Sequence, residues 1–241
     1  MVWGRAALAR GGISAVLAGS VLLSIGVSTA GAVTRSSAGV QSSSTGPALV
    51  AWWAMNEGAG SVMNDAVADN DGRLHSARLA QSGYSGTAYG FNGSSSYVSV
   101  PSDSDLNPGT KDIVITIHLK TTSVPAKPDW DLIRKGKYTS KGGEFKMEYQ
   151  PTGKASCGFK GSSQGGNKGS LSAGPALNNG KWHRVQCVKT SSAIRLIVDG
   201  KSYSKPIRIG SISNSDPVVI GARPGSEFFQ GVLDEAIIQI G

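Results

Sequence analysis

Residues 180–200 limit the possible folds more than any other stretch, because apolar and polar side chains alternate in them and the stretch ends with Asp199-Gly200. The apolar side chains recur at every second residue: Val185 and Cys187, followed by Ile194, Leu196 and Val198. A period of two is typical of a strand with one buried face, and Asp-Gly favours the tight turn of a hairpin. The stretch therefore predicts two β-strands and a hairpin turn.

The same pattern recurs through most of the chain. Residues 112–121 alternate four aliphatic side chains with more polar ones, and Asn92-Gly93 marks another hairpin turn. Thirty-three glycines and few charged residues suit short strands joined by many turns. No segment after residue 45 has a helical period. We therefore predict an all-β fold, in which residues 48–241 form one β-sandwich domain of two antiparallel sheets.

Residues 1–32 have the layout of a secretory signal peptide. Arg5 and Arg10 precede a long uncharged stretch, and Ala30-Gly31-Ala32 offers a small-residue cleavage site. The alternative is an uncleaved membrane anchor, because the uncharged stretch is long enough to span a bilayer. Its glycine and serine content favours cleavage. Residues 33–47 predict a flexible Ser/Gly-rich linker. We therefore expect a secreted, extracellular domain without stable membrane insertion.

Several spaced motifs carry a resemblance to a known family. They are WWAMNEGAGS at residues 52–61, TAYGFNGSSSYVSVP at 87–101, KWHRVQCVKTSSAIRLIVDGK at 181–201 and FFQGVLDEAII at 228–238. Together they resemble laminin G-like domains of the concanavalin A-like lectin/glucanase superfamily. The resemblance implies a jelly-roll sandwich, in which lectin-like relatives use the concave sheet as the ligand face. It is weak for function, because one fold hosts many ligands.

The resemblance also implies a structural calcium ion. Residues 65–74, with Asp65, Asp69 and Asp71, resemble an acidic turn that often lies near calcium in such domains, together with an aspartate of the last strand, here Asp234. Calcium binds six to eight hard oxygen atoms, which aspartates and turn carbonyls supply. This copy is one residue shorter than the family pattern, and Ala68 stands where glycine is usual. The alternative is a turn held by its own side-chain hydrogen bonds.

The chain has two cysteines, Cys157 and Cys187, both on predicted strands of a chain that we expect to be exported. Oxidising conditions favour a disulfide between them. Many bacterial laminin G-like domains resemble this chain in having cysteines at these two places. The alternative is a pair of buried free thiols.

The net charge of +8 is concentrated in one region, since residues 134–168 hold eight basic side chains against two acids. One interpretation is a solvated face that aids solubility. The other is a surface that binds an anionic glycan or wall polymer, because no nucleic-acid-binding module is recognisable. An exposed tryptophan could also stack on a sugar. The candidate ligand-binding residues are Trp52, Lys135, Lys137, Lys141, Lys160 and Lys168.

No catalytic constellation is recognisable in the sequence. Glu144 and Glu148 share a face of one predicted strand but lie about 13 Å apart along it, too far for a retaining glycosidase pair. His118 has no second metal ligand at useful spacing, and we interpret it as structural. We therefore predict a non-catalytic module that binds a carbohydrate or cell-surface polymer. The alternatives are a protein–protein adhesion module that uses the basic region, or a glycoside hydrolase with a dispersed site.

Overall fold

The computed structural model describes residues 46–162, 167–223 and 225–241. The predicted signal peptide, residues 1–32, and almost all of the predicted linker, residues 33–47, lie outside this part of the chain. The described residues form sixteen β-strands and no helix. Accordingly, they contain no helix that is long and apolar enough to cross a membrane.

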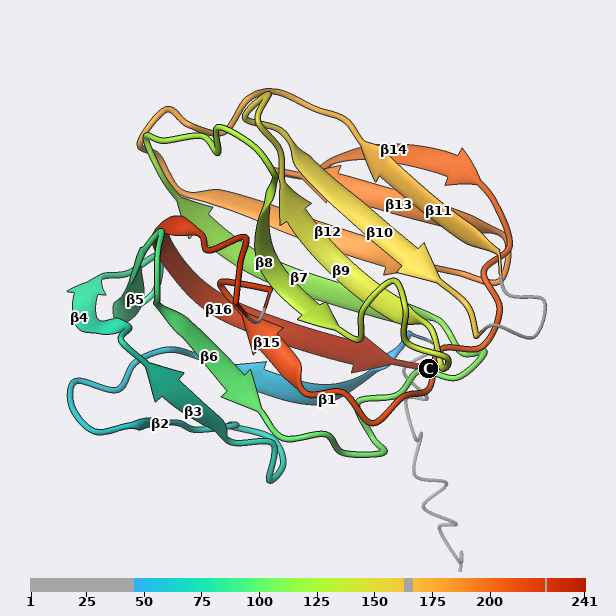
Figure 1. Cartoon of the computed structure of the whole chain (residues 1–241), viewed down its shortest axis with the longest axis horizontal. Coiled ribbons are helices and arrows are strands. Elements are labelled where there is room, and N and C mark those ends of the chain that lie inside the picture. Colours follow the sequence, from blue (N-terminus) through green and yellow to red (C-terminus); the bar gives the residue numbers. More distant parts are fainter. Residues whose placement is uncertain (1–45, 163–166, 224) are drawn as a thin grey trace, which may run out of the picture. The chain divides into compact units, whose positions relative to one another are not determined.

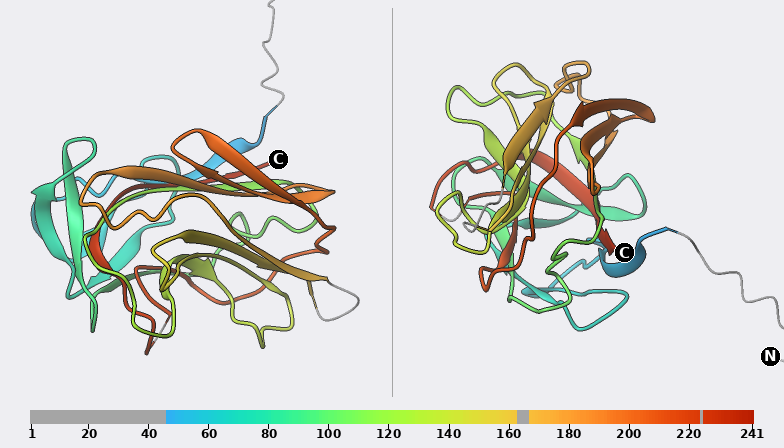
Figure 2. Two further views of the ribbon diagram at one scale, coloured as in Figure 1. Left: turned by 90° about the horizontal axis from the view of Figure 1, so that it is seen from above. Right: turned by 90° about the vertical axis from the view of Figure 1, so that its right-hand side faces the viewer.

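The strands form two antiparallel sheets that pack face to face (Figures 1 and 2). Sheet A has the order β14-β13-β12-β7-β16-β5-β4, and β1 pairs with another part of β16. Its strands are β1 (Ala48–Trp53), β4 (Arg78–Ser82), β5 (Thr87–Asn92), β7 (Ile113–Lys120), β12 (His183–Lys189), β13 (Ala193–Val198), β14 (Lys201–Pro206) and β16 (Gln230–Ile240).

Sheet B has the order β11-β10-β9-β8-β15-β6-β3-β2. Its strands are β2 (Val62–Met63), β3 (Gly72–His75), β6 (Tyr97–Val100), β8 (Trp130–Lys135), β9 (Glu144–Tyr149), β10 (Ala155–Lys160), β11 (Lys168–Ser172) and β15 (Val218–Ile220). Neighbours in both sheets are often far apart in sequence, as in a jelly roll. The predicted all-β sandwich of two antiparallel sheets is confirmed.

The alternating residues of the sequence form the core between the sheets. In β7 the four aliphatic side chains predicted for one face are fully buried, and Ile115 and Ile117 lie opposite Cys187 and Val185 of β12. The predicted turn at Asp199-Gly200 joins β13 to β14, and both of its residues have positive φ angles, 49° and 83°. Two positive φ angles define the type I′ turn that fits the twist of a hairpin.

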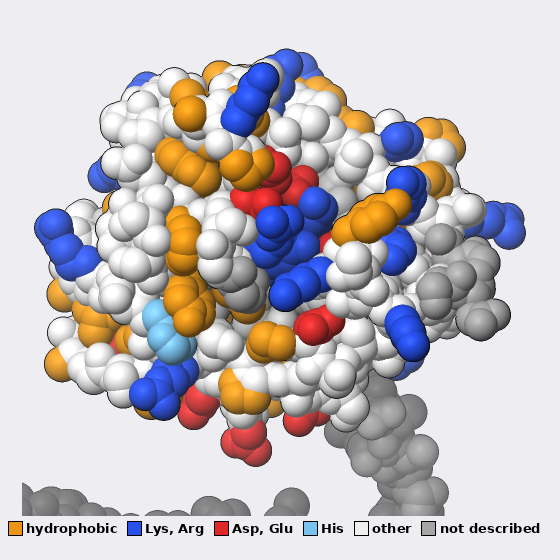
Figure 3. Space-filling model, viewed as in Figure 1, with side chains coloured by type: hydrophobic (Ala, Val, Ile, Leu, Met, Phe, Trp, Pro, Cys, Tyr) orange, Lys and Arg blue, Asp and Glu red, His pale blue; other side chains and the backbone are white. Residues whose placement is uncertain are grey.

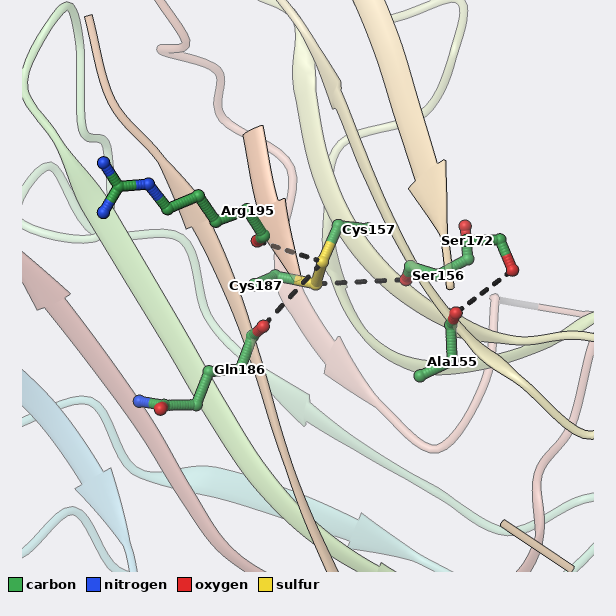
Figure 4. The surroundings of a disulfide bond; sticks show 7 residues. All are labelled: Ala155, Ser156, Cys157, Ser172, Gln186, Cys187 and Arg195. Atoms are coloured by element: carbon green, nitrogen blue, oxygen red, sulfur yellow. Dashed lines mark hydrogen bonds between the residues drawn. A yellow bond between two sulfur atoms is a disulfide. The ribbon is translucent and has the colours of Figure 1, made fainter. Parts of the chain in front are cut away.

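The disulfide between Cys157 and Cys187 joins the two sheets through β10 and β12 (Figure 4). The sulfur atoms lie 2.03 Å apart and the Cα atoms 5.5 Å apart, within the usual range for a disulfide. The predicted pairing is confirmed. Because the bond crosses the core, it fixes the position of β10, the strand at the centre of the groove described below.

Candidate functional site

A groove of about 590 Å³ lies on the outer face of sheet B, over β9, β10 and β11. Phe145, Met147 and Tyr149 of β9 are buried in the core, so the residues between them point to the opposite side. Figure 3 shows this face, with acidic side chains gathered beside basic ones near its middle. We call the hollow the sheet B groove. Its charged and aromatic lining residues are Asp129, Tyr138, Glu144, Lys146, Glu148, Phe159, Lys160, Lys168 and Lys205.

One end of the groove carries an exposed aromatic ring with two ammonium groups beside it. Tyr138 is 57% exposed, and the Nζ atoms of Lys160 and Lys168 both lie 4.9 Å from the centre of its ring. Lys168 Nζ also donates a hydrogen bond of 2.7 Å to the Tyr138 hydroxyl, which lowers the pKa of that hydroxyl. Lys205 lines the same groove. This lysine–tyrosine end offers positive charge and a flat apolar ring to a ligand.

The floor of the groove carries three carboxyl groups that converge from two strands and a loop. Asp131 of β8 is paired in register with Glu148 of β9, and Asp129 lies just before β8. One oxygen atom of each residue lies within 4.8 Å of the other two. We call Asp129, Asp131 and Glu148 the acidic cluster. It is the one such group of three or more potential metal ligands among the residues that the structure describes.

Burial shifts the proton affinities of this cluster. It raises the pKa of Glu148 to about 8, helped by a hydrogen bond with the Asp129 carboxyl group and opposed by Lys146. It likewise raises the pKa of Asp131 to about 6, although Arg134 opposes the shift. Both buried carboxyl groups therefore bind a proton more tightly than a carboxyl group in water does.

Arg134 ties the acidic cluster to its surroundings. Its buried guanidinium group donates to Asp131 at 2.5 Å and to Glu144 at 3.0 Å, and it lies 3.8 Å from Glu227. Lys146 is paired with Glu148. The groove therefore has an acidic floor and a basic end. It differs from the uniformly basic face that the charges of residues 134–168 indicate.

The predicted metal ligands lie at two separate places. Asp65 accepts hydrogen bonds from the amides of Trp52 and Val67, and the amide of Asp65 donates to Asp71 at 2.8 Å. Asp69 is exposed. The turn is thus held by side-chain hydrogen bonds of its own, and it forms no group of three converging ligands within the described chain.

Asp234 packs against a different loop. Its Oδ2 atom accepts hydrogen bonds of 2.8 and 3.0 Å from the backbone amides of Tyr84 and Ser85. A β-bulge after Asp234 turns the chain here, and Glu235 has a positive φ of 50°. Asp234 therefore fixes the turn between β4 and β5. The four predicted calcium ligands are not brought together, and the calcium ion itself stays a prediction.

The remaining candidates divide into four groups. Trp52 is half-buried, and its indole Nε1 donates to Glu235 at 2.6 Å. Lys135 is fully buried, with its ammonium group bonded to Ser102 and to the carbonyl of Asp216. Lys137 and Lys141 are exposed but do not line the groove, whereas Lys160 and Lys168 do.

A second pocket, of about 450 Å³, lies at the ends of β4, β5, β7 and β16. On the same sheet, exposed Tyr84 stacks on His118 at 3.9 Å and meets Trp182 edge to face. Burial lowers the pKa of His118 to about 4, so it is neutral at physiological pH. Neither ring nitrogen of His118 has a hydrogen-bond partner among the described residues, and the structural role stays a prediction. The pocket has no acidic residue in its lining and no exposed aromatic ring, so it combines fewer kinds of contact than the sheet B groove.

Two features of the groove were missed by sequence reasoning. The acidic cluster forms across strands, so spacing along β9 alone gave only the distant pair Glu144 and Glu148. Tyr138 lies in the loop between β8 and β9, where no alternation of apolar and polar residues marks its position. The alternation of acid, base and acid at 144, 146 and 148 was a usable sign, because it places three charges on one face of a strand.

Comparisons with known proteins agree with this architecture. Residues 92–239 match the family Laminin_G_3, described as the concanavalin A-like lectin/glucanases superfamily. No curated protein matches the chain in sequence. Among solved structures, the binding domain of Paraclostridial Mosquitocidal Protein 1 has a TM-score of 0.61 and 14% identity, with 80% of this chain and 48% of that chain covered.

Two further structures are similar. Domain 4 of AbnA, an extracellular arabinanase from Geobacillus stearothermophilus solved with arabinotriose, has a TM-score of 0.58 and 14% identity, with coverage of 81% and 93%. The binding domain of botulinum neurotoxin DC, solved with SialylT, has a TM-score of 0.58 and 11% identity, with coverage of 80% and 48%. The chain spans about half the length of both toxin domains. At such identities the similarity shows the fold alone.

The family match covers more than half of the chain, and the two antiparallel sheets are those that the family predicts. The chain therefore belongs to the laminin G-like domains of the concanavalin A-like lectin/glucanase superfamily.

Proposed function

We propose that this chain is a non-catalytic binding module that holds an extracellular carbohydrate chain in the sheet B groove. The observation that carries the proposal is the lysine–tyrosine end, where the exposed Tyr138 lies close to Lys160 and Lys168 in the lining of a groove of about 590 Å³. Sugar rings stack on aromatic faces, and their acidic substituents pair with ammonium groups. An anionic glycan or cell-surface polymer matches this end best.

Two further observations support binding outside the cell. The chain contains a disulfide, and disulfides persist in oxidising compartments. The residues expected to form a signal peptide precede the domain.

Domain 4 of the arabinanase was solved with a bound oligosaccharide, and one toxin binding domain was solved with SialylT. These ligands belong to those proteins, and they support carbohydrate as the class of ligand to test.

The test is binding to an array of oligosaccharides that includes a uronic-acid, a sulfated and a neutral arabinan series. We expect the wild-type chain to bind an anionic series, and Tyr138→Ala or the double variant Lys160→Ala/Lys168→Ala to lose at least about tenfold in affinity, since each contact contributes on the order of 1 kcal/mol or more. Rising salt should weaken the binding.

Lys137→Ala/Lys141→Ala is the matched control, because it removes the same charge from exposed lysines outside the groove. Equal losses in both double variants would point to a diffuse basic face and contradict a site in the groove. Binding only to proteins would favour the adhesion module. Release of reducing ends from a polysaccharide would contradict the non-catalytic part of the proposal.

A further inference from the structure

The floor of the sheet B groove holds a carboxyl group whose hydrogen bonds do not account for both of its oxygen atoms. Asp131 is fully buried, and its Oδ1 atom has no hydrogen-bond partner among the described residues. A buried oxygen atom without a hydrogen-bond partner is costly, so such an atom in a native structure indicates a partner such as a water molecule or an ion.

The charges around the acidic cluster do not balance. Five carboxyl groups, those of Asp129, Asp131, Glu144, Glu148 and Glu227, surround three cationic side chains, which are Arg134, Lys146 and Arg223. Arg134 is shared by three of the acids, and Arg223 is exposed at the far side of Glu227. The carboxyl groups thus outnumber the cationic groups that pair with them, and a bound cation would lower the repulsion among them.

We propose that Asp129, Asp131 and Glu148 bind one divalent cation of the hard, oxygen-preferring class, such as Ca²⁺, at the floor of the sheet B groove. The three residues offer oxygen atoms within 4.8 Å of one another, a spacing that a cation with ligand distances of about 2.3–2.6 Å can bridge. Asp129 and Glu148 line the groove, so an ion and its remaining water ligands can enter from solvent. This site is separate from the turn at residues 65–71 and does not depend on carbohydrate binding.

Lys146 is the group that a cation has to displace. It pairs with Glu148, and 26% of its side chain is exposed, so its ammonium group can turn out into solvent. Its methylene groups lie against Gly158 of β10, where a Cβ atom would come within 2.9 Å of them. Arg134, in contrast, is buried and hydrogen-bonded on several sides, and it remains in place.

The experiment is isothermal titration calorimetry of the full secreted chain with Ca²⁺ alone, after treatment with a chelator. We expect a stoichiometry of one, because the three residues form a single group of converging oxygen atoms.

Three variants locate the ion. Glu148→Gln keeps the shape of the side chain and should weaken Ca²⁺ binding at least about tenfold, or about 1.4 kcal/mol. Lys146→Met removes the competing charge and should strengthen it by a similar factor. Asp71→Asn changes the other acidic turn and should leave the affinity unchanged.

Four outcomes would overturn the proposal: no binding by the wild-type chain and by Lys146→Met, unchanged affinity in Glu148→Gln, weaker binding in Lys146→Met, or loss of binding in Asp71→Asn alone. The Lys146→Met variant guards against a folding artefact, since a damaged fold cannot bind calcium more tightly. Because the titration uses no carbohydrate, its result is independent of the result of the oligosaccharide array.

Discussion

Glu148 is the single residue on which the chemistry of the sheet B groove depends most. It is 6% exposed, burial raises its pKa to about 8, and it is paired with Lys146. Burial makes the charged form of the carboxyl group costly, so the folded chain holds this proton more tightly than the unfolded chain does. Stability, ion binding and the charge that a ligand meets are therefore linked through one proton.

The free energy of unfolding should fall as the pH rises from about 4.5, the ordinary pKa of glutamate, to about 8, the pKa of Glu148 in the folded chain. A raised pKa means that the folded state binds more protons in this window, so its stability is greatest below the unfolded pKa. The slope is at most about 1.4 kcal/mol per pH unit for each such group. Asp131 adds a fall in the same direction up to about pH 6.

Urea unfolding at several pH values, in the presence of a chelator, measures this slope. Glu148→Gln cannot titrate, so its stability should decrease less between pH 6 and 8 than that of the wild-type chain. Parallel curves for the two proteins would show that Glu148 does not hold an extra proton in the folded state. Asp69→Asn, at an exposed position, is the control.

Among the elements, β9 and β10 form the floor of the groove, and the disulfide connects β10 to β12 of the opposite sheet. Outward residues of β9 supply the charges, while inward residues of the same strand fill the core. The site is therefore built mainly on strands with fixed positions. Tyr138, at the lysine–tyrosine end, comes from the loop between β8 and β9.

Removing the disulfide should destabilise the fold by roughly 3–4 kcal/mol, because the bond closes a loop with a sequence separation of 30. The Cys157→Ala/Cys187→Ala variant avoids reactive thiols, and urea unfolding gives the difference in free energy. We expect carbohydrate affinity below the transition to change little, since neither cysteine lines the groove. A stability equal to that of the wild type would contradict the expected constraint on the unfolded chain.

For the whole molecule, much of the fold could be predicted, because alternation and turn chemistry are local signals. The inward aliphatic residues of β7 and the Asp199-Gly200 turn needed only neighbours in sequence. The acidic cluster could not be predicted in this way, because Asp131 and Glu148 meet through the register of β8 and β9. Lys135 was predicted as a ligand-binding residue because it lies in the basic stretch. Its ammonium group is instead bonded inside the protein to the Ser102 hydroxyl and the Asp216 carbonyl.

Net charge is likewise a poor guide to the binding face. The chain carries a net charge of +8, but the groove combines a basic end with an acidic floor. A long-range positive field attracts anionic polymers, whereas the local arrangement determines which of them fits. A ligand with acidic groups spaced along a chain would meet the lysines at one end of the groove and the acidic cluster on its floor.

Hydrogen–deuterium exchange of the full chain, with and without the oligosaccharide that binds it best on the array, tests directly whether the sheet B groove is the binding site. We predict slower exchange in peptides from β9, β10 and β11 and in the loop that carries Tyr138. Protection confined to the face around Tyr84 and Trp182, or to the turn at residues 65–71, would contradict the account, as would the absence of any binding oligosaccharide.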